Sequence, residues 1–239
     1  STHILCKKAI DFKIKKMVLI STDKAVRPTN IMGASKRLSE KIVNYYAHLK
    51  PNQLTNFSMV RFGNVLGSSG SVVNLFKEQI KNGGPITLTH SKIVRFFMTV
   101  KEASQLVIQS IHLSKQGDLF LLDMGEAIPI KKLAEQMIQL SGLKIKNKQN
   151  PNGDIEIVIT KLRDGEKLYE ELLVNDKSEI TAHPRIFRAK EEFHFEENFI
   201  ELITILEEKI LNKKTEESLS LLKKLVPDWE RNKSSHIII

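Results

Sequence analysis

The sequence predicts an α/β protein whose central sheet is largely parallel. Short apolar runs without polar alternation, such as residues 17–20, are typical of strands buried on both faces. They alternate with longer segments whose apolar residues recur at helical spacing, the pattern of strand–helix–strand units. The chain has 239 residues, 41% hydrophobic and 27% charged, which suits one large domain or two small ones. It has no run of 18 apolar residues, so no bilayer-spanning helix is expected.

Local signals place the first elements in chain order. Residues 4–15 carry a rough apolar stripe and predict a helix, and the run 17–20 predicts a buried strand. A polar loop leads to Pro28, a helix-start signal. The next helix is therefore expected over residues 29–49, with Pro51 marking its end.

The same alternation continues along the chain. Apolar content predicts a strand over 57–62, and a helix over 72–81 ends in the C-cap sequence 82–84. A Thr-x-x-Glu capping box at 99–102 opens an amphipathic helix that reaches about Ser114. Further strands are expected at 86–89, 119–122 and 155–160, and further helices at 130–140, 166–173 and 199–211.

The net charge of +9, from 37 basic and 28 acidic side chains, fits a Lys-rich solvated surface or acidic partners. The basic run at Lys144, Lys146 and Lys148 lacks interleaved aromatic residues, so we expect a solvated loop and no nucleic-acid partner.

The single Cys6 excludes a disulfide framework and fits a reducing compartment, the cytoplasm. The seven histidines lack metal-ligand spacing, and no metal site is expected.

The most informative chemistry follows the strand 17–20. In a parallel sheet, ligands bind beyond the carboxyl ends of the strands, and Ser21, Thr22, Asp23 and Lys24 stand there. A hydroxyl, an acid and an amine side by side can donate and accept protons. Asp23 and Lys24 reach one substrate only if the chain has already turned. The alternative is a polar turn with an ordinary Asp–Lys ion pair.

Met32 and Lys36 are four residues apart on the second predicted helix, so their side chains share one face. The simplest interpretation is a methionine in the core and a lysine that extends to water.

Several segments together resemble a known family. The segment 18–37 is similar to the extended short-chain dehydrogenase/reductase superfamily, and more closely to the capsule and O-antigen nucleotide-sugar 4,6-dehydratases that act on UDP-N-acetylglucosamine. Most members carry Tyr-x-x-x-Lys where this chain has Met32 and Lys36; one branch of the dehydratases also has Met. Supporting similarities, in the family's order, lie at 61–67, 70–72, 95–99, 163–172 and 222–229.

The resemblance implies a partial Rossmann-like, doubly wound parallel sheet and a smaller C-terminal α/β substrate lobe. The chain has no Gly-x-Gly-x-x-Gly, the turn that binds a dinucleotide pyrophosphate. We therefore expect the C-terminal part of a longer enzyme, without the first half of the fold and inactive alone. The expected divisions are residues 1–143 for the Rossmann part, 144–230 mainly for the substrate lobe, and 231–239 for a flexible tail. The amphipathic segment 201–214 is expected to cover the substrate lobe.

The resemblance also implies the reaction: an NAD-dependent lyase removes water from a UDP-sugar and leaves a 4-keto-6-deoxy sugar. Thr22 would hydrogen-bond the sugar O4, Asp23 would protonate the departing 6-hydroxyl, and Lys24 would take the C5 proton. Lys36 would hold the nicotinamide ribose. The group that takes the O4 proton in place of the missing Tyr stays open between Asp23 and a water held by Lys36.

Further residues are expected to contact the ligands. For the cofactor they are Ser21, Lys36, Phe62 and Gly63. For the UDP-sugar they are Asn64, Ser71, Val72, Arg95, Arg163 and Glu166. Forked guanidinium groups suit a diphosphate, with Arg163 the first choice and Arg95 the second. Glu166, Lys167 and Glu170 also fit pairing on a helix surface.

Two other functions compete. A nucleotide-sugar 4-epimerase shares the fold and cofactor but does not need the Asp23–Lys24 pair. A catalytically silent nucleotide-sugar-binding module is favoured by Met32. A homo-oligomer is expected, and membrane association only through parts outside this chain, with the parent protein held at the cytoplasmic face of the inner membrane.

Overall fold

The structure, a computed structural model, describes residues 1–49, 54–68, 70–171 and 177–230. It divides into two compact units. Unit 1 contains residues 1–62, 105–123 and those from 171 onward; unit 2 contains residues 63–104 and 124–170. The boundary expected at residue 143 does not separate them, because residues 63–104 and 124–170 share a core of their own. Pro51 and the tail expected at 231–239 lie outside the described residues.

Unit 1 is built on a five-stranded sheet in the order β1-β2-β7-β12-β11. β1 (Lys16–Thr22), β2 (Asn56–Phe62) and β7 (Leu119–Leu122) are parallel. β12 (Ile186–Ala189) and β11 (Ser178–Ile180) extend the sheet in antiparallel fashion. The three predicted strands of this unit are confirmed, whereas β11 and β12 were not predicted.

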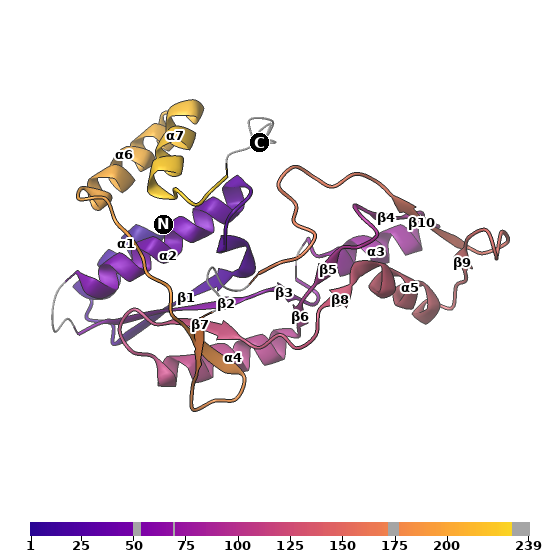
Figure 1. The fold of residues 1–239 in the computed structure, drawn as a ribbon, viewed down its shortest axis with the longest axis horizontal. Helices are drawn as coiled ribbons and strands as arrows, with labels where there is room; N and C mark the ends of the chain where they lie inside the picture. The colour runs from indigo at the N-terminus through magenta and orange to yellow at the C-terminus, as the bar shows by residue number, and fades with distance from the viewer. Residues whose placement is uncertain (50–53, 69, 172–176, 231–239) are drawn as a thin grey trace. The chain divides into compact units, whose positions relative to one another are not determined.

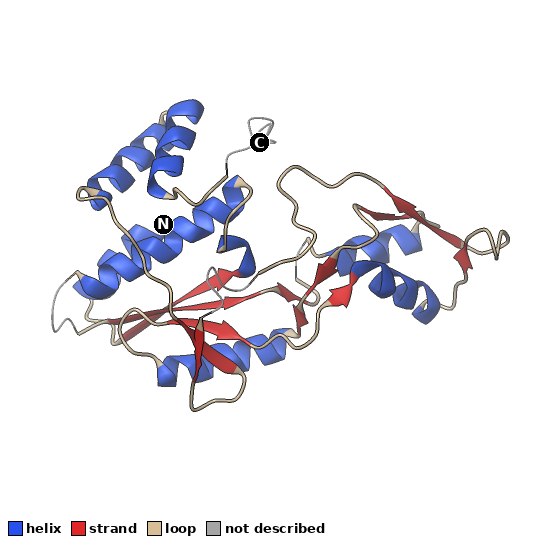
Figure 2. Ribbon diagram, in the orientation of Figure 1, coloured by secondary structure: helices blue, strands red, loops and turns tan. Residues whose placement is uncertain are grey.

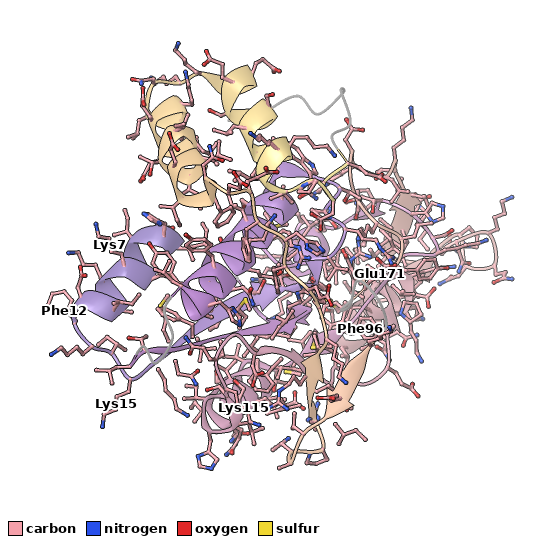
Figure 3. The ribbon with its side chains drawn as sticks, turned by 60° about the vertical axis from the view of Figure 1, so that its left-hand side comes forward. Lys7, Phe12, Lys15, Phe96, Lys115 and Glu171 are labelled. Carbon is pink, nitrogen blue, oxygen red and sulfur yellow. The ribbon has the colours of Figure 1, made fainter. Side chains whose placement is uncertain are left out.

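β1 is an edge strand of this sheet. The loop that leads into it from the preceding helix carries Phe12 and Lys15, whose side chains extend outward (Figure 3). Phe12 is 73% exposed, and Ile20, within β1 itself, is 52% exposed. The edge of the parallel sheet therefore presents apolar surface to solvent.

Helices cover both faces of this sheet (Figures 1 and 2). α1 (Thr2–Asp11) and α2 (Ile31–His48) lie on one face, and α4 (Val100–Leu113), whose residues from 105 belong to unit 1, lies on the other. α6 (Phe199–Leu211) and α7 (Thr215–Leu225) pack together and against α2. Between these layers, β2 and β7 bury their apolar side chains on both faces, as their sequence pattern predicts. The run 17–20 of β1 is only partly buried and Ile20 is exposed, because β1 lies at the edge of the sheet.

The helix expected to cover the substrate lobe lies instead in unit 1. Phe199, Leu202 and Ile203 of α6 are buried in one hydrophobic cluster with Val43 of α2 and Trp229. An apolar stripe shows that a helix buries one face, but it does not say against which partner. That assignment was therefore wrong, although the helix itself was predicted correctly.

Unit 2 contains a three-stranded parallel sheet with the order β4-β10-β9. Its strands are β4 (Ile86–Leu88), β10 (Ile155–Ile159) and β9 (Ile145–Lys146), and it packs with α3 (Val72–Lys81) and α5 (Ile130–Leu140). Two short ladders belong to the same unit: β3 (Asn64–Val65) with β6 (Phe97–Met98), and β5 (Val94–Arg95) with β8 (Ile128–Pro129).

Two sequence predictions in unit 2 need correction. The described part of 166–173 forms no helix, because Gly165 adopts a φ of 72° and the Lys167 and Leu168 carbonyls accept hydrogen bonds from Arg95 instead. Glu166, Lys167 and Glu170 therefore do not pair on a helix surface. The expected loop around Lys146 contains the short strand β9, which pairs with β10.

Predicted helix ends are confirmed where capping sets them. The Asn30 side chain accepts a hydrogen bond from the Gly33 amide at 2.9 Å and starts α2. In the capping box before α4, the Thr99 amide donates to the Glu102 carboxylate at 2.9 Å, and the Glu102 amide donates to the Thr99 hydroxyl at 3.1 Å. Within the described ranges, no helix combines the length and hydropathy that crossing a membrane requires.

Candidate active site

Three reactive side chains meet where β1 ends. Thr22 is the last residue of the strand, and Asp23–Ala25 forms one turn of 3₁₀ helix directly after it. The Asp23 carboxylate accepts a hydrogen bond from the Thr22 hydroxyl at 2.8 Å and one from the Lys24 ammonium at 2.9 Å. The chain has therefore already turned, and the acid and the amine converge on one point.

Asp23 is fully buried, with 0% of its surface exposed, whereas the Lys24 side chain is 28% exposed. One Asp23 oxygen, Oδ1, accepts both bonds; the buried Oδ2 has no hydrogen-bond partner among the described residues. A buried polar atom without a partner costs about 1–3 kcal/mol. An ordinary surface ion pair on a polar turn does not fit this burial, and Oδ2 is available to accept a hydrogen bond or to carry a proton.

Gly33 lets this turn pack directly against α2. A Cβ atom at position 33 would lie 2.4 Å from the Lys24 carbonyl oxygen and 3.0 Å from the Pro28 Cβ. Only a residue without a side chain fits between the helix and the turn. The glycine next to Met32 thus brings the start of α2 close to Lys24.

Met32 and Lys36 lie in the first turns of α2, on the solvent side. Met32 is 47% exposed and Lys36 is exposed. Met32 is therefore not a core methionine. Helical geometry places the two residues on the same helix face, where an exposed lysine can meet a ligand.

Ser21 turns in the opposite direction, into the protein. It is 4% exposed, and its hydroxyl donates to Glu40 Oε1 at 2.6 Å. Glu40, from α2, also accepts two hydrogen bonds from the Arg61 guanidinium, each at 2.7 Å. Glu191 and Arg37 complete this group of buried charges.

The charges around Arg61 set one another's ionisation. Burial opposes the charged form of Glu191, but hydrogen bonds and charge from Arg61 and Arg37 outweigh it, and the pKa of Glu191 lies below its ordinary value. Burial likewise opposes the charge of Arg61, but Glu40 and Glu191 overcome it and raise its pKa. Glu191 and Arg61 are therefore both charged at neutral pH.

Sequence reasoning did not identify Glu40, Arg37 or Glu191 as part of the site. One signal was available: Arg61 follows Phe57 and Met59 at a spacing of two, so it points to the same buried face. A charge on a buried strand face requires a partner of opposite sign. Its partners could not be identified, because Glu191 is 130 residues away in the chain.

The predicted cofactor residues Phe62 and Gly63 mark the end of β2. Phe62 pairs in register with Thr22 of β1, so the carboxyl ends of the two strands are level. Gly63 is the first residue of unit 2.

The predicted substrate residues all belong to unit 2. The Asn64 amide group donates to the Phe96 carbonyl at 3.2 Å. The Ser71 hydroxyl caps α3 and accepts from the Asn74 amide at 3.4 Å, and Val72 is the first residue of that helix. These side chains are thus engaged locally, at the ends of short elements.

The two predicted diphosphate ligands differ in their surroundings. The Arg95 guanidinium donates to the carbonyls of Val94, Lys167 and Leu168, and Glu166 lies 3.7 Å from it. Arg163 is exposed, and its backbone amide donates to Glu166 at 3.1 Å. Of the two guanidinium groups, that of Arg163 is the more accessible to a ligand.

Residues 1–191 match the family model described as "Polysaccharide biosynthesis protein". The "Capsular polysaccharide biosynthesis protein CapD" of Staphylococcus aureus is 44% identical over 221 residues, 91% of this chain and 34% of the relative. A "UDP-glucose 4-epimerase" of Rickettsia canadensis is 38% identical over 168 residues, 70% of this chain and 46% of the relative. This chain thus spans less than half the length of either relative.

Solved structures show the same fold. "Pen from Bacillus thuringiensis" has a TM-score of 0.68 and 37% identity over 78% of this chain and 56% of that one. A dTDP-glucose 4,6-dehydratase of Bacillus anthracis, in complex with NAD, has a TM-score of 0.56 and 20% identity over 69% of this chain and 55% of that one. The expected Rossmann-like α/β class is confirmed.

Proposed function

Because the chain belongs to the polysaccharide biosynthesis protein family, we propose that it is the C-terminal part of an NAD-dependent UDP-sugar 4,6-dehydratase, with UDP-N-acetylglucosamine as its substrate. The observation that carries this proposal is the convergence of Thr22, Asp23 and Lys24 at the end of β1. A dehydration needs both an acid for the leaving hydroxyl and a base for the carbon-bound proton. This turn supplies an acid and an amine within hydrogen-bond distance of each other.

The residues present fit one end of the cofactor. The orphaned Asp23 Oδ2 and the exposed Lys36 both occur near the carboxyl end of β1, the place where α/β sheets bind their ligands. We assign Lys36 to the nicotinamide ribose. The chain at Ser21, Phe62 and Gly63 is assigned to the remaining contacts with the nicotinamide end of NAD. The chemistry that NAD supplies when bound is removal of a hydride from sugar C4 and its return at C6.

The chain's own residues would move the protons. Thr22 donates to Asp23, so the proton of the sugar O4 can pass through the Thr22 hydroxyl to the Asp23 carboxylate. Once C4 is a ketone, the C5 proton is acidic, and Lys24 removes it as a neutral amine, after its ammonium proton has passed to solvent on its 28% exposed side. The electron pair of that C–H bond forms the C5–C6 double bond, and the 6-hydroxyl leaves as water with the proton from Asp23. Lys24 then returns its proton to C5.

The diphosphate of the substrate is assigned to Arg163. Its guanidinium belongs to an exposed residue, whereas that of Arg95 already donates to three carbonyls. Arg95 is the second choice for the diphosphate. Whether or not it binds that group, its bonds to the Lys167 and Leu168 carbonyls hold the segment that carries Arg163. Asn64, Ser71 and Val72 remain proposed contacts of the sugar nucleotide.

The test uses the longer parent protein with UDP-N-acetylglucosamine and mass analysis of the product. We expect the product to be lighter than the substrate by one water. Asp23→Asn and Lys24→Met should each reduce turnover by about 10²–10⁴, the usual contribution of a positioned proton transfer, with folding preserved by circular dichroism. Lys92→Met, at an exposed lysine of unit 2, is the matched control and should turn over normally.

A 4-epimerase is the second candidate, favoured by the identity to the Rickettsia relative. Epimerisation leaves the substrate mass unchanged, so a product of equal mass would replace the dehydratase with this alternative. Binding of the UDP-sugar without any product would indicate the silent module that Met32 favours. Mass analysis separates the dehydratase from the other two functions, and chromatographic separation of the two epimers distinguishes the epimerase from the silent module.

A further inference from the structure

Four buried side chains form a network of ion pairs beneath the proposed catalytic turn. We call Arg37, Glu40, Arg61 and Glu191 the ionic cluster. Arg61 is 0% exposed; it holds Glu40 through Nε and Nη2 and Glu191 through Nη1 and Nη2. Arg37 Nη1 bridges the same two carboxylates, at 3.1 Å to Glu40 and 2.9 Å to Glu191. Two positive and two negative charges balance within the cluster.

The cluster replaces the apolar core at one end of the sheet. On the face of β1 and β2 that packs against α2, Met17 and Leu19 alternate along β1, and Phe57 and Met59 along β2, all in or against one hydrophobic cluster. The next residues on this face are Ser21 and Arg61, which are paired in register. The change from apolar to charged therefore comes at the carboxyl ends of the strands, where the catalytic turn begins.

Stability alone does not account for this arrangement. Removing charges from water costs several kcal/mol per ion, and well-packed apolar residues of similar volume often stabilise a fold as well or better. What a charged network adds is a defined geometry, because each guanidinium fork fits its carboxylates in only one orientation. The ionic cluster thus holds the Glu40 carboxylate in one place.

Ser21 connects that fixed carboxylate to the catalytic turn. Its hydroxyl donates to Glu40 Oε1 at 2.6 Å, and Thr22 and Asp23 follow it directly in the chain. Alternation along β1 directs Ser21 toward α2 and Thr22 away from it. A strand fixed at position 21 therefore fixes the direction in which the Thr22 hydroxyl leaves the sheet.

The segment from Ser21 to Pro28, which contains the catalytic turn, is also held at its Pro28 end. Arg37 pairs with Asp228 at 3.2 Å, and the neighbouring Glu230 amide donates to the Pro28 carbonyl at 3.2 Å. Pro28 lies between the catalytic turn and α2. The C-terminal residues thus support the segment that the cluster anchors at Ser21.

We propose that the ionic cluster, acting through Ser21, is a positioning device that holds Thr22, Asp23 and Lys24 in their catalytic geometry. The catalytic part of this inference rests on the proposed function. Ser21, Glu40 and Arg61 are positioning residues in this account, because their side chains act through the turn and not on the substrate.

The test compares Ser21→Ala with Ser39→Ala in the longer parent protein. Both remove one hydroxyl, but that of Ser39 donates to the Ser35 carbonyl of its own helix, outside the cluster. Hydrogen exchange of the amides at 22–26 should become at least 10-fold faster in Ser21→Ala, with β2 and β7 unchanged. Turnover should fall roughly 10- to 100-fold with KM within about twofold, since small misplacements of reacting groups act on kcat. Ser39→Ala should match the wild type in both measurements.

Two further variants separate positioning from simple loss of structure. Ser21→Thr keeps the hydroxyl, so the amides at 22–26 should exchange as slowly as in the wild type and most of the turnover should remain. Glu40→Gln should slow turnover at least as much as Ser21→Ala, and the double variant should be no slower than Glu40→Gln, because both act through one link. Unchanged exchange at 22–26 in Ser21→Ala would overturn the proposal, as would altered exchange with wild-type kcat. If the wild type turns over no UDP-sugar, the proposed function fails, and the exchange measurement alone decides whether the cluster holds the turn.

Discussion

Single residues decide whether the catalytic turn can form. Asp23 and Lys24 are adjacent in the chain, and in an extended strand they would point to opposite faces. The 3₁₀ turn rotates them onto the same side, and Gly33 allows that turn to lie against α2. The chemistry of an acid and an amine thus depends on a residue that contributes no chemistry.

Gly33→Ala tests this dependence. Alanine is favoured over glycine inside a helix by about 1 kcal/mol, but here its Cβ would lie 2.4 Å from the Lys24 carbonyl oxygen. The backbone of the turn must move, so we expect a fall in turnover of about 100-fold or more and a net loss of stability of about 1–3 kcal/mol. Chemical unfolding and steady-state kinetics of the parent protein measure both effects.

The control is Ser35→Ala, on the solvent side of the same helix, where the hydroxyl donates to the Met32 carbonyl. It should leave the unfolding free energy within about 0.5 kcal/mol of the wild type. Wild-type turnover in Gly33→Ala would show that the close approach of α2 does not set the position of Lys24.

At the scale of elements, the sequence predicted those helices and strands whose bounds depend on nearby residues. The helix at 72–81 and the strand at 119–122 were predicted with the bounds that the structure shows, because periodicity and capping determine them. β11 and β12 were missed, since β12 pairs with β7, far earlier in the chain, and β11 in turn pairs with β12. The same limit applies to the site. The position after a strand predicted the residues of the turn, but it gave no signal for Glu40, which accepts from Ser21, or for Glu191, which pairs with Arg61.

α7 was also missed, although its apolar residues recur at helical spacing. Leu222 is buried in the cluster that α6 and α2 share, whereas Leu211, at the end of α6, is 77% exposed. We expect Leu222→Ala to destabilise unit 1 by about 2–5 kcal/mol and Leu211→Ala by less than about 0.5 kcal/mol. Urea unfolding of the chain compares the two. Equal effects would mean that α7 is not part of the core.

At the scale of the whole molecule, the free edge of β1 bears on the cofactor. β1 is a parallel edge strand with the exposed Ile20, and the loop before it exposes Phe12. Natural sheets seldom leave a long apolar edge uncovered. The matched part of this chain covers 34% of the Staphylococcus relative and 46% of the Rickettsia relative. We propose that, in the parent protein, preceding strands of the Rossmann-like sheet pair with this edge and supply the glycine-rich turn for the pyrophosphate.

This proposal predicts a difference in cofactor binding between the chain and its parent. The residues assigned to NAD here hold only its nicotinamide end, so the 239-residue chain should bind it weakly. The parent protein, with a helix N-terminus at the pyrophosphate, should carry NAD through purification. Release by acid and chromatographic assay measures the content of each. Stoichiometric NAD in the short chain would place the whole cofactor site within these residues and remove the need for a further half of the sheet.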